Sequence, residues 1–115
     1  MTFDDQPKSL LRLLNQLFEL ERRVATSPDG LNVLRQVRRM KELFEEDFHL
    51  VFEDPIGQTF NETRTDVEGR LAGGSADDLV IVETIKPIIR SLNCPTTFIE
   101  QKGIVIASAR SEQNQ

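Results

Sequence analysis

Apolar residues recur at helical spacing through the first half of the chain. Between residues 8 and 25 they fall three and four positions apart, and a similar series runs from residue 31 to about residue 47. This spacing predicts two amphipathic helices. The segment Thr26-Ser27-Pro28-Asp29-Gly30 separates them and predicts a turn in which Ser27 caps the second helix and Pro28 takes its first position. Because the connection is short, we expect an antiparallel helical hairpin.

The apolar stripe of the first helix is wider than one coiled-coil seam, because Leu11, Leu14 and Phe18 flank the residues at a/d spacing. A stripe of this width needs at least two neighbouring elements. It favours a four-helix bundle formed by two chains, with packing inside the chain's own domain as the alternative. The expected dimer contacts are Leu10, Leu13, Leu14, Leu17, Leu20 and Val24. The residues expected to face inward on the second helix are Leu31, Leu34, Val37, Met40 and Phe44.

The pattern changes at the turn that runs from Asp54 to Phe60. Beyond it the apolar residues alternate or form short β-branched runs, which predict strands. Strands are expected at 49–53, 65–71, 79–85, 98–100 and 104–107, with Pro87 ending regular pairing. The predicted fold is α+β, with a helical dimerisation module at 8–48, a small and mostly antiparallel β domain at 49–108, and flexible tails at 1–7 and 109–115.

Composition and charge limit the setting in which the protein works. The one cysteine, Cys94, allows no intrachain disulfide and favours a reducing compartment. No signal peptide or membrane-spanning run is found, so we expect a cytoplasmic protein without a membrane partner. Residues 1–41 carry eight basic and five acidic residues, a net of +3, whereas residues 42–115 carry six and fourteen, a net of −8. An acidic second half repels nucleic acid and suits a basic protein partner.

The sequence does not favour an enzyme, a metal site or a bound cofactor. His49 and Cys94 are the single residues of their types, and their placement suggests neither a catalytic triad nor a zinc site. His49 is expected in a strand, and Cys94 in a loop or core. The basic run Arg35, Arg38, Arg39 and Lys41 leaves a nucleic-acid-binding helix as a less favoured alternative.

Five segments, taken in order, resemble the GrpE family, the nucleotide exchange factors of DnaK-type chaperones. Residues 10–22, LLRLLNQLFELER, are similar to the family's "LLPVLDNLERA" helix, and Gly30-Leu31 opens the next helix as the family's "EGV" does. GQTFN at 57–61 is similar to the "GEPFDP" turn. VETIKP at 82–87 is similar to "VEVLRPGY", and IVIA at 104–107 is similar to the closing "VVVA" strand. The resemblance covers roughly residues 10–107.

The resemblance implies a homodimeric co-chaperone that binds the nucleotide-binding domain of a DnaK-type chaperone and promotes ADP release. The implied chaperone contacts are Gly57, Gln58, Phe60, Glu83, Lys86, Pro87 and Arg90. Phe60 can equally be a core residue beneath the turn, and Gly57 can serve only the turn's backbone conformation.

The chain departs from the family pattern at three places. Residues 65–67 are TDV where the family has "HEA", residues 88–89 are II where it has "GY", and residues 99–103 are IEQKG where it has "LRPAM". These departures lie in the β domain, which grips the chaperone in the family. A GrpE-like dimeric adaptor without exchange activity is therefore a second alternative.

Overall fold

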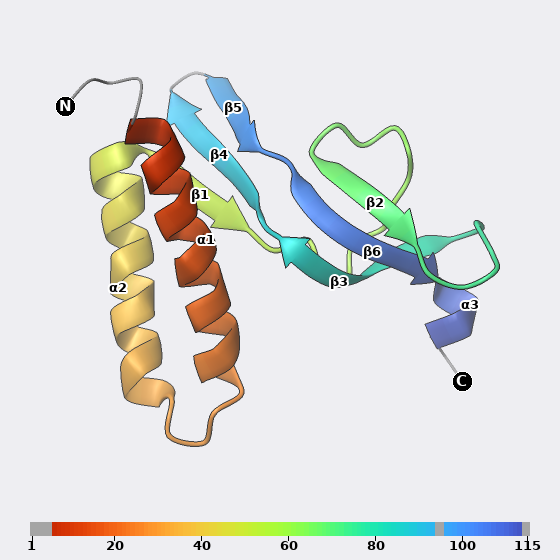
Figure 1. Cartoon of the computed structure of the whole chain (residues 1–115), viewed down its shortest axis with the longest axis horizontal. Coiled ribbons are helices and arrows are strands. Elements are labelled where there is room, and N and C mark those ends of the chain that lie inside the picture. The colour runs from red at the N-terminus through yellow and green to blue at the C-terminus, as the bar shows by residue number, and fades with distance from the viewer. Residues whose placement is uncertain (1–5, 94–95, 114–115) are drawn as a thin grey trace. The chain divides into compact units, whose positions relative to one another are not determined.

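A computed structural model describes residues 6–93 and 96–113 (Figure 1). The fold is α+β, with two helices followed by two small three-stranded sheets. The chain divides into two compact units. We call Met1–Phe52 with Arg90–Phe98 the helical unit, and Glu53–Ile89 with Ile99–Gln115 the sheet unit. The boundary predicted from the sequence, between residues 48 and 49, lies where helix changes to strand. The division into compact units differs, because it groups residues 49–52 and 90–98 with the helices.

The helical unit begins with the predicted hairpin. Helix α1 (Gln6–Ala25) and helix α2 (Leu31–Phe48) lie side by side and run in opposite directions (Figure 1). The buried residues of α1 are Leu14, Leu17 and Phe18, and that of α2 is Val37. The Phe18 ring meets the Phe52 ring edge to face at 5.8 Å. The hairpin therefore packs within its own unit through part of its apolar stripe.

The turn between the helices differs from the expected cap. Helix α2 begins at Leu31, and Gly30 is its N-cap residue, without a side-chain hydrogen bond. The Gly30 N–H donates to the Ser27 carbonyl at 3.2 Å, so residues 27–30 form a turn before the helix. A Cβ at Gly30 would lie 2.2 Å from the Val24 carbonyl oxygen, so only glycine fits there. The prediction that Ser27 caps and Pro28 opens α2 is therefore wrong.

The far end of α2 also differs from the expectation. His49 has a φ of 55° and ends the helix as its C-cap, with its N–H donating to the Glu45 carbonyl at 3.0 Å. This left-handed residue reverses the chain direction, as at many helix ends. Strand β1 (Leu50–Glu53) starts one residue later, so the placement of His49 in a strand is wrong.

The first sheet has the order β1-β4-β5, with β4 (Ile88–Asn93) in the centre and β5 (Thr96–Gln101) at one edge. Strand β4 was not predicted, because Pro87 was expected to end regular pairing. Pro87 separates strand β3 from strand β4 by one residue, and β4 begins with Ile88 and Ile89, which are both fully buried.

The second sheet has the order β2-β6-β3, with bounds Val67–Leu71, Gly103–Ala109 and Leu79–Lys86. Strand β6 is central, antiparallel to β3 and parallel to β2. One face carries the core of the sheet unit, which comprises Phe60, Val67, Leu79, Ile81, Ile88, Val105 and Ala107. Phe60 lies over Gly69, where a Cβ would come 2.4 Å from the ring. Gly69 thus makes room for Phe60.

The predicted tails are shorter in the structure. Gln6 and Pro7 belong to α1, Ala109 ends β6, and helix α3 (Arg110–Gln113) follows. The Arg110 N–H donates to the Asp78 carbonyl at 2.9 Å, which ties α3 to the loop before β3. The predicted tail at 109–115 is therefore wrong for residues 109–113. Residues 1–5 and 114–115 and the predicted loop or core position of Cys94 lie outside the described residues.

The apolar face predicted for α2 is only partly buried. Val37 is buried and Leu34 and Phe44 are half-buried, but Leu31 and Met40 are exposed. The prediction that Leu31 and Met40 face inward is wrong, because Leu31 is the first helical residue and Met40 lies at the edge of the buried stripe. No helix in residues 6–93 or 96–113 has both the length and the apolar composition to cross a bilayer.

Candidate functional site

The turn that follows β1 runs beside β3, so the structure brings together two segments that the sequence analysis singled out. The Gly57 N–H donates to the Ile81 carbonyl at 2.8 Å, and the Ile81 N–H donates to the Gln58 carbonyl at 2.9 Å. The Phe60 N–H donates to the Leu79 carbonyl at 3.0 Å. These bonds cover the edge of β3 that β6 leaves open, and they fix the turn to the sheet.

The Arg64 side chain stabilises the turn through hydrogen bonds to residues within it and after it. Its Nε and Nη2 atoms donate to the two carboxylate oxygens of Asp66, each at 3.0 Å. Nη1 donates to the Thr59 carbonyl at 3.0 Å, and Nη2 also donates to the Gln58 side chain at 3.1 Å. The hydrogen bonds to Asp66 raise the pKa of Arg64 above its usual value. Sequence reasoning missed this residue, because its partners are identified only once the turn is folded.

The start of the turn is tied to β3 by a buried hydroxyl. The Thr84 hydroxyl donates to the Asp54 carboxylate at 2.6 Å, and the same carboxylate accepts the Ile56 N–H at 3.1 Å. Gly57 follows with a φ of 85°, a conformation that side chains disfavour. Backbone and side-chain hydrogen bonds together therefore present Gln58 on a fixed support.

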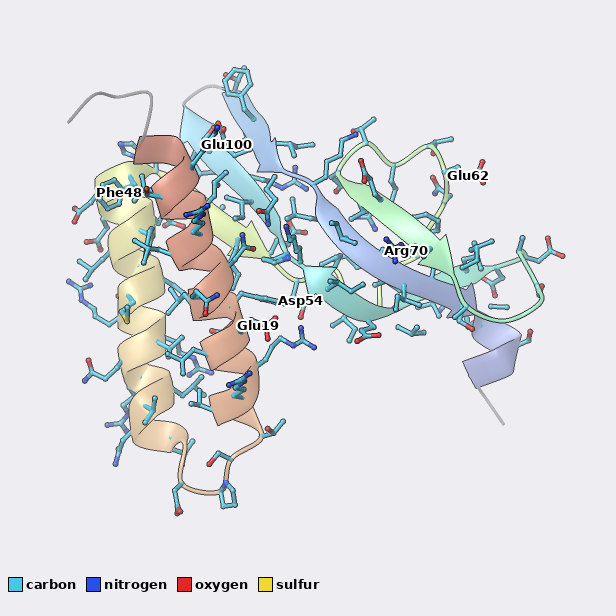
Figure 2. All side chains as sticks on the ribbon, in the orientation of Figure 1. Glu19, Phe48, Asp54, Glu62, Arg70 and Glu100 are labelled. Carbon is cyan, nitrogen blue, oxygen red and sulfur yellow. The ribbon has the colours of Figure 1, made fainter. Side chains whose placement is uncertain are left out.

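The face of the second sheet that points away from its core carries two rows of paired residues. Arg70, Ile106 and Glu83 are cross-strand neighbours in one row, and Glu68, Ile104 and Lys86 are neighbours in the other. Paired residues in a sheet project from the same face. We call these six residues the outer sheet face. Figure 2 labels Arg70 on β2, one edge strand of this sheet.

A β-bulge places Glu83 and Lys86 on this same face. Residues three apart on a regular strand point to opposite faces. The register shifts between Thr84 and Lys86, so Ile85 is an extra residue, and Lys86 pairs with Ile104. Because of the bulge, the two residues proposed from the sequence flank the same pair of isoleucines.

The outer sheet face combines a partly apolar centre with exposed charged residues. Ile104 and Ile106 are half-buried, and the four charged residues around them are exposed. Each row ends in opposite charges, and Lys102 adds a cation 3.8 Å from Glu68. A partly apolar centre with a charged rim is typical of protein interfaces. Sequence reasoning missed Ile104, Ile106, Glu68 and Arg70, because the strand register, which brings them together, is not visible in the sequence.

The remaining chaperone contacts proposed from the sequence lie in different surroundings. Gln58 and Gly57 are exposed at the turn, whereas Phe60 is only 9% exposed and Pro87 is buried. Phe60 and Pro87 therefore support the sheet unit from within. Arg90 is half-buried and belongs to the helical unit.

The proposed dimer contacts on α1 fall into three groups. Leu14 and Leu17 are buried within the chain, and Leu10 and Val24 are half-buried. Leu13 and Leu20 are 56% and 41% exposed. They lie seven residues apart on the side of α1 opposite to Phe18. Exposed apolar residues of α2 are Val33, Met40 and Leu43.

The basic residues of α2 are partly neutralised within the chain. Arg39 pairs with Glu42 at 2.9 Å, and the hydrogen bond to Glu42 together with the charge of Glu46 raises the pKa of Arg39. Lys41 pairs with Glu21 at 3.1 Å and lies 4.6 Å from the centre of the Phe52 ring. Two of the four cations that suggested nucleic-acid binding thus already have acidic partners.

Among the described residues, no three histidine, cysteine or acidic side chains gather as metal ligands would. No family model matches the sequence, and no curated protein or solved structure matches it either.

Proposed function

We propose that this chain is a GrpE-like co-chaperone that binds the nucleotide-binding domain of a DnaK-type chaperone and promotes ADP release. The observation that carries the proposal is the outer sheet face. It combines half-buried Ile104 and Ile106 with exposed Glu83 and Lys86 on a small sheet. The order of segments that resembles the family supports the same function.

The mechanism requires only a difference in binding free energy. A protein that binds the open form of the chaperone's nucleotide-binding domain more tightly than the closed form shifts the population toward the open form. ADP is then released more readily, and by linkage ADP weakens the binding of the co-chaperone by the same factor. Such coupling typically amounts to about 1–3 kcal/mol, or roughly 5–150-fold. No catalytic acid, base or metal takes part.

The rigidity of the turn supports this role. A surface that shifts an equilibrium must keep its shape against the domain that it opens, otherwise it adapts to both states and favours neither. Arg64, Asp54 and the backbone bonds to β3 hold Gln58 in place beside the sheet. We therefore place Gln58 in the contact surface together with the outer sheet face.

We also propose that the exposed apolar residues of the hairpin pair with a second copy. Leu13 and Leu20 on α1 and Val33 and Met40 on α2 remain outside the chain's own core. Two such hairpins packed together form a four-helix bundle, which removes these residues from water. Leu14 and Leu17 then stabilise each hairpin rather than the contact between copies.

Charge reversal on the outer sheet face is expected to weaken chaperone binding. Glu83→Lys and Lys86→Glu each place the wrong charge beside Ile104 and Ile106, and we expect the Kd to rise about tenfold. The measurement is isothermal titration calorimetry with the isolated nucleotide-binding domain of a DnaK-type chaperone. Glu62→Lys, an equal charge change at an exposed loop position of the same unit, is the control and should stay within about twofold.

The proposal is contradicted if the wild-type chain shows no binding in this titration. It is also contradicted if Glu62→Lys weakens binding as much as Glu83→Lys does, because binding would then follow net charge rather than a surface. Circular dichroism of each variant is the check that the fold is unchanged by the substitution.

A further inference from the structure

Beside α2, the helical unit contains a groove that plays no part in the proposed function. It has a volume of about 440 Å³ and lies between α2 and strand β1. Its apolar lining comes from Leu14, Leu50 and Phe52, and its rim is charged. Leu13 and Leu20, the exposed leucines proposed for contact between copies in the four-helix bundle, are not among its lining residues.

The edge of β1 forms one wall of this groove. Three consecutive residues, Leu50, Val51 and Phe52, line it. Successive side chains of a strand point to opposite faces, so one face offers only every second residue. Three consecutive residues therefore line the groove along the backbone edge of the strand. Strand β1 is terminal in the order β1-β4-β5, so in residues 6–93 and 96–113 no strand pairs with this edge. An unpaired edge of this kind is a template for another strand.

The other wall of the groove, formed by α2, has a charge pattern that is complementary to an antiparallel copy of itself. Arg38, Lys41, Glu42 and Glu45 of α2 line the groove, and Arg35 lies one turn before Arg38 on the same side. Lys41 already pairs with Glu21 at 3.1 Å, which leaves two arginines and two glutamates in the pattern. Position 40 is the centre of this pattern, because Arg38 and Glu42 lie two residues from it and Arg35 and Glu45 lie five residues from it. If a second, antiparallel α2 helix crosses at the level of residue 40, each arginine of one helix lies opposite a glutamate of the other.

We propose that this face pairs with the same face of a second copy of the chain, with the two α2 helices antiparallel and the β1 edges beside each other. Such a contact requires a two-fold axis. The axis must pass both the centre of the charge pattern of α2, at position 40, and the edge of β1. The arrangement is compatible with one such axis, because residues of α2 on both sides of position 40 and three consecutive residues of β1 line the same hollow. The occupant is therefore a second copy, since the surface is complementary to itself.

This contact is distinct from the proposed four-helix bundle and uses a different side of the hairpin. Two different two-fold contacts on one chain close into a tetramer when their axes meet at right angles, and otherwise they continue into a larger assembly. The prediction is thus an assembly of 13.1 kDa chains that is larger than a dimer, with a tetramer as its smallest closed form, and that dissociates to dimers on dilution. If the helical bundle does not form, this contact alone gives a dimer.

Arg35 and Glu45 provide the sharpest test. Ten residues separate them on one helix, a rise of about 15 Å, so they cannot pair within a chain. Both are exposed, and neither forms an ion pair within the part of the chain that the structure describes. Arg35→Glu creates two like-charged pairs across the axis, whereas Arg35→Glu combined with Glu45→Arg restores two opposite pairs. Arg38 and Glu42 are less suitable, because Glu42 already pairs with Arg39.

The experiment is analytical ultracentrifugation of the full chain over a range of concentrations. For this contact we expect Arg35→Glu to raise the dissociation constant about tenfold or more, and the double variant to return to within about threefold of wild type. Arg12→Glu, a reversal at an exposed position of α1, is the control and leaves this contact unchanged.

Three results overturn the inference. The first is a wild-type chain that never exceeds a dimer, with a dimer that Leu13→Glu disrupts and Arg35→Glu does not. The second is a double variant that is as weak as the single one. The third is a chain that remains monomeric at every concentration, which also removes the proposed bundle. A dimer that Arg35→Glu disrupts and Leu13→Glu does not supports the inference and contradicts only the bundle.

Discussion

Replacing Phe60 with alanine is expected to lower the free energy of unfolding of the sheet unit by about 3 kcal/mol. Truncation of a buried phenylalanine typically costs about 3–5 kcal/mol, and Phe60 is at the lower end because its side chain is 9% exposed. Its ring packs over Gly69, where a Cβ would come 2.4 Å from the ring. Urea unfolding followed by far-ultraviolet circular dichroism measures the loss, since the chain has no Trp or Tyr for fluorescence.

Phe98→Ala, the same truncation at an exposed position of the helical unit, is the control for Phe60→Ala. Phe98 is 54% exposed, so the same truncation should cost less than about 1 kcal/mol. Equal losses for the two variants would contradict the assignment of Phe60 to the core. A large loss of chaperone affinity in Phe60→Ala without any loss of stability would show instead that the ring contacts the partner.

The second large effect is expected in the helical unit at Phe18. This residue is 2% exposed, packs edge to face on Phe52 and lies 5.2 Å below the Arg22 guanidinium. Phe18→Ala therefore removes a buried ring, an aromatic pair and a cation–π contact. We expect a loss of about 3–4 kcal/mol, measured by the same unfolding experiment.

Leu31→Ala is the control in this unit, because Leu31 is 75% exposed at the first position of α2. Alanine favours helix formation, so the control should change stability by less than about 0.5 kcal/mol. A loss at Leu31 comparable to that at Phe18 would mean that this end of α2 is buried in solution, for example by a second copy.

The sequence was sufficient to predict the two helices and most strands, because the spacing of apolar residues differs between a helix and a strand that each bury one face. It was not sufficient to tell which part of a wide stripe is buried. Leu13 and Leu14 are adjacent and equally apolar, yet Leu13 is exposed and Leu14 is buried. The choice depends on where β1 packs against the hairpin, and the chain order does not reveal this.

Two local predictions follow common sequence rules and are nevertheless wrong. Ser27 and Pro28 satisfy the usual rules for a helix start, but residues 27–30 form a turn, and the helix begins at Leu31 with Gly30 as its N-cap residue. Pro87 satisfies the rule for a strand end, but one residue without an N–H is tolerated between two strands, and β4 follows it.

The candidate site was predictable in part. Glu83, Lys86 and Gln58 were proposed from the resemblance and are exposed in the structure. Their neighbours Ile104 and Ile106 required the register of β6 with β3, and the shared face of Glu83 and Lys86 required the bulge at Ile85. A single sequence contains no direct signal for register or for bulges, so the surface emerges only when the strands are paired.

Release of a fluorescent ADP analogue from a DnaK-type chaperone, followed by stopped flow, tests the central claim most directly. We expect a saturating amount of the wild-type chain to raise the ADP dissociation rate at least about tenfold, and Glu83→Lys at the same concentration to raise it much less. An unchanged dissociation rate in the presence of bound protein would contradict exchange activity and leave a GrpE-like adaptor.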